Sequence, residues 1–123
     1  MPTICHFEIP ADDIERIKKF YAKLFGWKIE KEEMPTEYWM ITTTTPDGKK
    51  GVSGGIEKRQ DPQHRITVCI DVPSIEEFQA KVEKLGGTVF VRKTAIPRKG
   101  YYAYCLDPEN NYFVLWESDK NAK

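Results

Sequence analysis

The sequence feature that most constrains the fold is an internal repeat, in which one order of predicted elements occurs twice. Residues 3–9 alternate like a strand, and Ile14 then begins a run of apolar residues at helical spacing that Gly26 closes. The same order returns later, with Ile75 in the place of Ile14 and Gly87 in the place of Gly26. Both pairs are 61 positions apart (75 − 14 and 87 − 26). Repetition at a fixed spacing predicts two copies of one structural unit.

Each predicted helix is followed by three predicted strands. They cover residues 27–32, 38–45 and 52–58 in the first copy and 88–93, 101–106 and 111–117 in the second. Pro10 is expected to end the first strand, and either Asp12 or Asp13 can cap the helix after it. A strand, a helix and three strands cannot bury a sheet alone, so the two units must pack together. We predict an α+β fold of two βαβββ modules, at about residues 3–58 and 64–118.

The bulk composition limits the classes of partner. The chain of 123 residues is the size of a single domain, 1–123, and carries 19 basic and 19 acidic residues without a basic stripe. We therefore expect no nucleic-acid partner. We also expect no membrane partner, because no apolar run approaches the roughly 20 residues of a membrane span. Three cysteines, an odd number at wide spacing, favour reduced thiols and a cytoplasmic location.

Three segments carry a resemblance to a known family. They read HFEIPADDIERIKKFYAKLFGWKIE, SIEEFQAKVEKLGGTV and DPENNYFVLWE, in that order. In these segments the chain resembles the vicinal-oxygen-chelate superfamily, which holds glyoxalase I, extradiol dioxygenases, methylmalonyl-CoA epimerase and the bleomycin- and fosfomycin-resistance proteins. The resemblance implies the glyoxalase/bleomycin resistance/dihydroxybiphenyl dioxygenase fold, a curved and mostly antiparallel sheet around a concave cavity. It also implies a homodimer.

The resemblance further implies four positions for metal ligands, on the first and last strands of each module. By spacing, these positions hold His6, Gly54, Thr67 and Leu115. Glycine and leucine side chains have no donor atom, and a neutral hydroxyl is a poor ligand, whereas a catalytic divalent ion needs about three protein ligands. His6 is thus the only retained ligand position, so we expect no conventional metal site and no cofactor. A divalent metal bound at a relocated site is the disfavoured alternative.

Strand alternation suggests which residues accompany His6. Glu8 lies on the same face of its strand as His6, and Glu117 on the same face as Leu115. If these three groups converge in the cavity, they form a candidate catalytic set for proton transfer, with His6, Glu8 and Glu117 as its members. The plainer alternatives are a half-buried histidine and carboxylates that are solvated or paired with lysine or arginine.

The cavity wall is predicted from the same alternation. The candidate ligand-binding residues are Gly54, Thr67, Cys69, Tyr101, Phe113 and Leu115. Glycines in the stretch GVSGG are interpreted as a strand that leaves room for a ligand or for the neighbouring module. His64, in a polar connector, is expected to be an exposed loop residue.

These observations favour a protein that binds a small organic molecule in the cavity without a conventional metal site. Two alternatives from other classes remain open. One is a divalent-metal-dependent lyase or isomerase of the glyoxalase I type, which the missing ligands oppose. The other is a non-catalytic interaction subunit whose cavity face serves another protein. Fold alone does not transfer function, so the sequence leaves the identity of the ligand and the occurrence of any reaction open.

Overall fold

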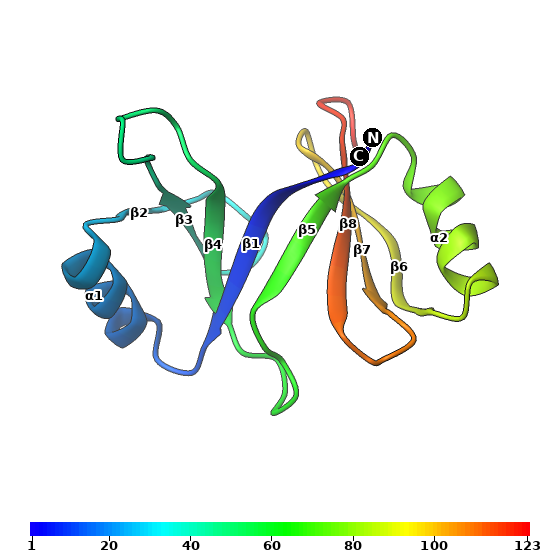
Figure 1. Ribbon diagram of the computed structural model, residues 1–123, viewed down its shortest axis with the longest axis horizontal. Helices are drawn as coiled ribbons and strands as arrows, with labels where there is room; N and C mark the ends of the chain where they lie inside the picture. The colour runs from blue at the N-terminus through cyan, green and yellow to red at the C-terminus, as the bar shows by residue number, and fades with distance from the viewer. The chain divides into compact units, whose positions relative to one another are not determined.

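The computed structural model describes residues 1–123 and contains eight strands and two helices (Figure 1). In chain order they are β1 (Thr3–Ala11), α1 (Ile14–Phe25), β2 (Lys28–Lys31), β3 (Tyr38–Thr42), β4 (Ser53–Lys58), β5 (Thr67–Asp71), α2 (Ile75–Lys84), β6 (Thr88–Ile96), β7 (Gly100–Leu106) and β8 (Tyr112–Ser118). This order confirms the predicted α+β fold with two βαβββ repeats. Neither helix combines the length and the apolar character that a membrane span requires.

The chain divides into two compact units. His6–Ile66 form one, called the first module below; Met1–Cys5 together with Thr67–Lys123 form the other, the second module. The division falls within β1, so the first residues of that strand group with the second module. The thiol of Cys5 accordingly donates a hydrogen bond to the Cys69 carbonyl at 3.5 Å.

The strands of the first module follow the order β2-β3-β4-β1. β1 pairs with β4 in parallel, and the β2–β3 and β3–β4 pairs are antiparallel. α1 packs on one face of this sheet, where a buried cluster forms from Ile9, Ala11, Ile14, Ile41 and Ile56. The other face carries no helix of this module, and the polar side chains described below lie there.

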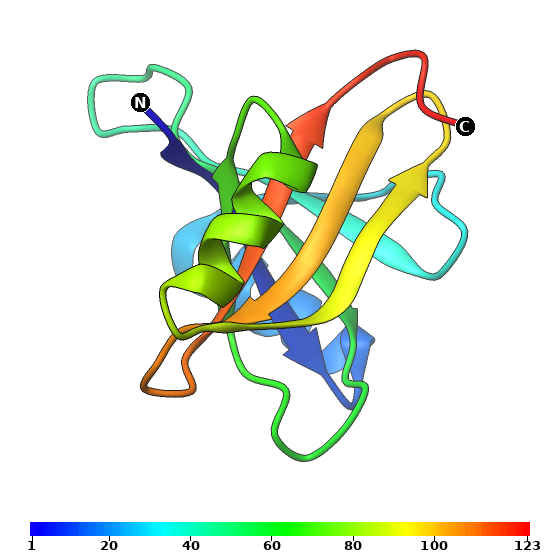
Figure 2. The same cartoon turned by 90° about the vertical axis from the view of Figure 1, so that its right-hand side faces the viewer.

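The second module repeats this plan with the order β5-β8-β7-β6. β5 and β8 are parallel, and the remaining pairs are antiparallel. Figure 2 shows α2 in front of this sheet, with which it shares a core of Val72, Ile75, Ala103, Cys105 and Leu115. Four of the six strand pairs within the modules are therefore antiparallel, which agrees with the mostly antiparallel expectation.

α1 begins and ends where the sequence signals predicted, whereas α2 begins at Ile75 as predicted but ends at Lys84, before Gly87. Asp13, rather than Asp12, caps α1, and its carboxylate accepts a hydrogen bond from the Arg16 backbone N–H at 3.1 Å. Gly26 ends α1 with a φ of 70°, a left-handed conformation that glycine adopts without a Cβ clash. Ser74 caps α2 in the same way, through the Glu77 N–H at 3.2 Å.

Three strands end two or three residues away from the predicted positions, whereas the other predicted strand ends differ by at most one residue. β1 continues through Pro10 to Ala11, because a proline near a strand end removes only one donor from the ladder. β3 ends at Thr42, and the residues after it form an isolated bridge between Thr44 and Lys50 around a turn. β6 extends to Ile96 with two register shifts against β7.

Candidate functional site

The sheet of the first module has two chemically different faces. Phe7 and Ile9 of β1 point toward α1 and join its apolar cluster. His6 and Glu8 alternate with them and therefore point to the opposite side. On that side they are accompanied by Tyr38 of β3 and by alternate residues of β4. We call this surface the polar face, and define it by His6, Glu8, Tyr38, Ser53, Gly55 and Glu57.

Gly55 allows the polar face to assemble. Tyr38 lies on β3, and β4 separates it from His6 and Glu8 on β1. A Cβ at Gly55 would lie 1.9 Å from the Tyr38 hydroxyl oxygen and 2.1 Å from its ring. Because Gly55 has no side chain, the Tyr38 ring crosses β4 and reaches the first strand. Tyr38 is 6% exposed.

A chain of hydrogen bonds links three strands across this face. The Tyr38 hydroxyl lies 2.7 Å from His6 Nε2 and donates to Glu8 Oε2 at 3.2 Å. Burial lowers the pKa of His6, so its imidazole is neutral near pH 7. Since the single Tyr38 proton goes to Glu8, the network assigns the His6 proton to Nε2. His6 Nδ1 then accepts from the Ser53 hydroxyl at 3.3 Å.

Glu8 and Glu57 are two acidic groups held close enough to affect each other. Glu57 lies directly opposite Tyr38 in the β3–β4 pair, and Glu8 is a diagonal neighbour on β1. Burial, together with the negative charge of Glu8, raises the pKa of Glu57 to about 8. Burial also raises the pKa of Glu8, while the hydrogen bond from Tyr38 acts in the opposite direction. We therefore assign the proton that the pair retains near pH 7 to Glu57.

Each of these carboxyl groups keeps one buried oxygen without a hydrogen bond. The atoms are Glu8 Oε1 and Glu57 Oε1. Glu57 Oε1 lies 3.4 Å from His64 Nε2, a contact that does not reach hydrogen-bond geometry. A buried polar atom without a partner costs about 1–3 kcal/mol, and native proteins contain few of them. Two such acceptors, on residues that are diagonal neighbours on one face of the sheet, indicate a place where a bound donor is expected.

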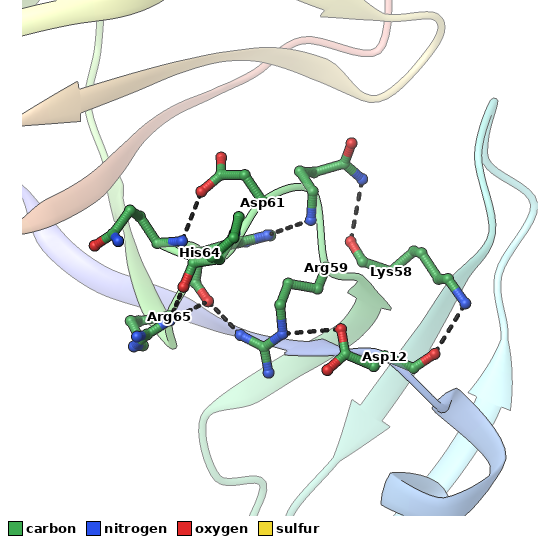
Figure 3. A network of polar contacts seen from close by, with 9 residues as sticks. Asp12, Lys58, Arg59, Asp61, His64 and Arg65 are labelled. Carbon is green, nitrogen blue, oxygen red and sulfur yellow. Dashed lines mark hydrogen bonds and ion pairs between the residues drawn. The ribbon is translucent and has the colours of Figure 1, made fainter.

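His64 lies beside Glu57 at one end of the polar face, and Figure 3 shows its contacts within the connector that follows β4. Its side chain is 12% exposed, so the expectation of an exposed loop histidine is wrong. The Gln60 backbone N–H donates to Nδ1 at 3.2 Å, which leaves the proton of the neutral ring on Nε2, toward Glu57. Arg59 bonds the His64 carbonyl and also pairs with Asp12 at 3.2 Å, which holds the connector against β1. Burial lowers the pKa of His64; the negative charge of Asp61 opposes this shift and the positive charge of Arg59 adds to it.

The predicted wall residues of the second module divide between its two faces. Tyr101, Phe113 and Leu115 pack against the α2 core, so the structure places them under the helix and not on the helix-free face. Thr67 and Cys69 lie on the opposite side of β5 from Ile70, which joins that core. Both are buried, and the Thr67 hydroxyl has no hydrogen-bond partner.

Glu117 and Gly54 also lie on the helix-covered faces. Glu117 accepts a hydrogen bond from the Ile75 backbone N–H at 2.9 Å, so its carboxylate caps the start of α2. A Cβ at Gly54 would lie 2.3 Å from the Phe7 ring, which belongs to the α1 side. The structure thus brings His6 and Glu8 together through Tyr38, whereas it gives Glu117 and Gly54 packing roles beside helices.

Sequence reasoning missed four members of the site: Tyr38, Ser53, Glu57 and His64. The 61-residue spacing correctly related Leu115 to Gly54, but both positions face the helices. A shift of one residue reverses the face of a strand, and the correct alternation in β4 runs through Ser53, Gly55 and Glu57. The sequence signal for this face was that Ser53 and Glu57 share one side of β4 with Gly55, while the apolar Ile56 points to the other side.

The residues present do not fit the divalent metal that the family resemblance implies. Both ring nitrogens of His6 are engaged, by Tyr38 and Ser53. No group of three or more histidine, cysteine, aspartate or glutamate side chains has the geometry to hold a metal ion. Cys105 offers no alternative nucleophile, because burial raises the pKa of its thiol to about 11.

Replacing Tyr38 by phenylalanine tests the hydrogen-bond chain. We expect Tyr38→Phe to lower the free energy of unfolding by about 1–3 kcal/mol, because it leaves the His6 N–H and a Glu8 oxygen without partners. Chemical denaturation measures the change. Tyr21→Phe is the matched control, since Tyr21 packs its ring against Trp27 and has no corresponding network. Equal losses in the two variants would contradict the assigned role of the Tyr38 hydroxyl.

Comparison with known proteins identifies a family and a relative that match most of this chain. The model of the family described as Glyoxalase/Bleomycin resistance protein/Dioxygenase superfamily matches residues 3–115. A protein from Didymella fabae, described as a glyoxylase-like domain-containing protein, is 33% identical over 87 residues, which are 68% of this chain and 68% of that protein.

Solved structures show the same fold at low sequence identity. A hypothetical protein from Bacillus halodurans C-125 has a TM-score of 0.69 at 16% identity, over 99% of this chain and 98% of that one. A Vibrio splendidus 12B01 member of the glyoxalase/bleomycin resistance protein/dioxygenase superfamily gives 0.67 at 15%, over 96% and 100%. A Streptomyces coelicolor methylmalonyl-CoA epimerase variant in complex with 2-nitronate-propionyl-CoA gives 0.68 at 14%, over 98% and 97%. At these identities the likeness concerns the fold alone.

Proposed function

Because this chain belongs to the glyoxalase/bleomycin resistance protein/dioxygenase superfamily, we propose that it binds a small organic molecule, and that the polar face of its first module supplies the binding groups. The observation that carries the proposal is the pair of buried acceptor oxygens, Glu8 Oε1 and Glu57 Oε1, without hydrogen-bond partners. A ligand with N–H or O–H donors satisfies them and recovers the desolvation cost of the two atoms.

Binding of this kind needs no metal. Tyr38 and His6 form a fixed scaffold, because each is held by the other and by groups on neighbouring strands. Fixed polar groups give orientation and specificity in small-molecule sites. The neutral His6, the ionised Glu8 and the protonated Glu57 also form a set that can accept or donate a proton, so proton transfer to a bound molecule is compatible with this site.

A panel of small organic molecules tests the proposal by thermal melting. We expect at least one compound with hydrogen-bond donors to raise the Tm of the native protein in a saturable way, because a ligand present at about a hundredfold its Kd stabilises a protein by about 2.7 kcal/mol. The rise is expected to shrink in Glu8→Gln. It is expected to persist in Glu33→Gln, which changes an exposed carboxylate outside the polar face. Absence of any saturable shift across a broad panel would contradict the proposal.

An enzyme assay on the same protein separates small-molecule binding from the two alternatives, a metal-dependent lyase and an interaction subunit. Formation of lactoylglutathione from methylglyoxal and glutathione, dependent on added divalent metal, would favour a lyase of the glyoxalase I type. A negative panel together with a negative assay would favour an interaction subunit. Assembly as a homodimer, which the resemblance implies, and a cytoplasmic location, which thiol-form cysteines support, stay part of the proposal.

A further inference from the structure

The two carboxyl groups of the polar face lack a positively charged partner. Neither Glu8 nor Glu57 pairs with a lysine or an arginine. The basic residues nearest in sequence to Glu57 are engaged elsewhere, since the Lys58 ammonium binds the Asp12 carbonyl at 2.9 Å and Arg59 pairs with the Asp12 carboxylate (Figure 3). Buried carboxylates are ordinarily paired with a cation, and near pH 7 the proton on Glu57 takes the place of that cation here.

The remaining groups around Glu57 do not supply that cation. From β1 it faces Glu8 and, beyond it, His6; from β3 it faces the Tyr38 hydroxyl; from the connector it faces His64. The pKa values of both histidines are lowered by burial, so both rings are neutral near pH 7. No cation therefore accompanies the two oxygens near pH 7, and the nearest donor to Glu57 Oε1 is the neutral His64 Nε2, at 3.4 Å and outside hydrogen-bond geometry.

We propose that the polar face selects ligands bearing a protonated amine, which binds between Glu8 Oε1 and Glu57 Oε1. The inference rests on the proposed binding function and adds the chemical class of the ligand. An ammonium group offers three donors and no acceptor, which matches two free acceptors in a site that contains no competing cation. The Tyr38 ring adds an aromatic surface to the same face, and aromatic rings attract cations. A carboxylate or phosphate ligand would instead be repelled by the acidic pair.

Amine binding is linked to proton release. A cation beside Glu57 favours its ionised form, so a ligand that binds near pH 7 displaces the proton that Glu57 retains. We expect the apparent affinity to rise by about tenfold for each pH unit until the pH reaches the pKa of Glu57, about 8, and to level off above it. Each ligand bound near neutral pH then releases close to one proton.

Four probes test the assignment by thermal melting at equal concentration and ionic strength. n-Butylamine, 1-butanol and butyrate share a four-carbon skeleton and differ in the charge of the polar group, and ammonium chloride supplies the cation without the alkyl chain. We expect a saturable rise in Tm with n-butylamine alone. Isothermal calorimetry of the native protein in two buffers of different ionisation enthalpy then measures the protons released by n-butylamine. In Glu57→Gln we expect at least a tenfold loss of affinity and no proton release, whereas Glu33→Gln behaves like the native protein.

The outcomes distinguish this inference from the function on which it rests. One possible result is that 1-butanol or butyrate raises the Tm as much as n-butylamine does, through Glu8. That result would overturn the amine assignment but leave the proposal of small-molecule binding intact. Equal stabilisation by ammonium chloride would overturn the assignment to an organic ligand. If n-butylamine causes no shift while other compounds of the broad panel do, the amine assignment fails alone. If no compound causes a shift, both proposals fail.

Discussion

Gly55→Ala is expected to destabilise the protein by about 3 kcal/mol, a large effect for the addition of one methyl group. The new Cβ would lie 1.9 Å from the Tyr38 hydroxyl and 2.1 Å from the ring carbon that bears it. Tyr38 cannot move cheaply, because it is buried and bonded to both His6 and Glu8. The substitution therefore either strains the sheet or expels the ring and breaks the hydrogen-bond chain. Urea denaturation gives the change in the free energy of unfolding.

A double-mutant cycle isolates the cause. In a Tyr38→Ala background the clash has no partner, so adding Gly55→Ala is expected to cost less than about 1 kcal/mol. A nuclear magnetic resonance titration of His6 adds a second readout, since displacement of Tyr38 removes the partner of Nε2. A cost for Gly55→Ala that stays the same in both backgrounds would show that backbone effects dominate and that the ring does not cross β4 as described.

The architecture was predictable from two kinds of evidence. The residues that begin and end the helices act locally, and the repeat carries the same order of elements from the first module to the second. Asp13, Gly26 and Ser74 satisfy backbone groups or conformations within a few residues of themselves, so their effect is readable from the sequence. The 61-residue spacing placed the second helix correctly, since Ile75 begins it and lies in its core. The prediction of two βαβββ repeats followed from those signals and is confirmed.

The site was less predictable because it depends on which side chains of each strand point toward the helix and which point to the opposite face of the sheet. His6 and Glu8 were placed together correctly by alternation. Gly54 and Leu115 were predicted to lie on the same side of the sheet as His6, but both face the helices. An error of one residue along a strand is enough to reverse the predicted face. The crossing of β4 by Tyr38 depends on a tertiary contact, which a glycine in the sequence permits but does not specify.

Glu57 is expected to make stability fall as the pH rises, which is the opposite of the usual behaviour of a paired carboxylate. Its folded-state pKa of about 8 lies above the ordinary value of 4.5, so the folded state binds more protons than the unfolded state between these values. Rising pH therefore favours unfolding across this window. The penalty is absent below about pH 4.5, grows as the pH approaches about 8, and is constant above it.

Glu57→Gln removes this titration and keeps the shape of the side chain. We expect the variant to match the native protein near pH 4 and to be more stable by about 5 kcal/mol near pH 9, as measured by urea denaturation across the range. His6 and His64 also titrate, and their lowered pKa values reduce stability as the pH falls below about 6.5. Both are present in the two proteins, so the difference between the two curves reports Glu57 together with its effect on the neighbouring Glu8.

The shape of that difference curve decides between a buried acid and an ordinary surface carboxylate. A rise confined to the interval between about pH 4.5 and about pH 8 identifies Glu57 as the group that keeps its proton. Glu33→Gln, on an exposed position, should give a flat curve. A flat curve for Glu57→Gln, or a loss of stability at alkaline pH, would mean that Glu57 is already ionised near pH 7. Cation binding would then proceed without the proton release on which the amine experiment depends.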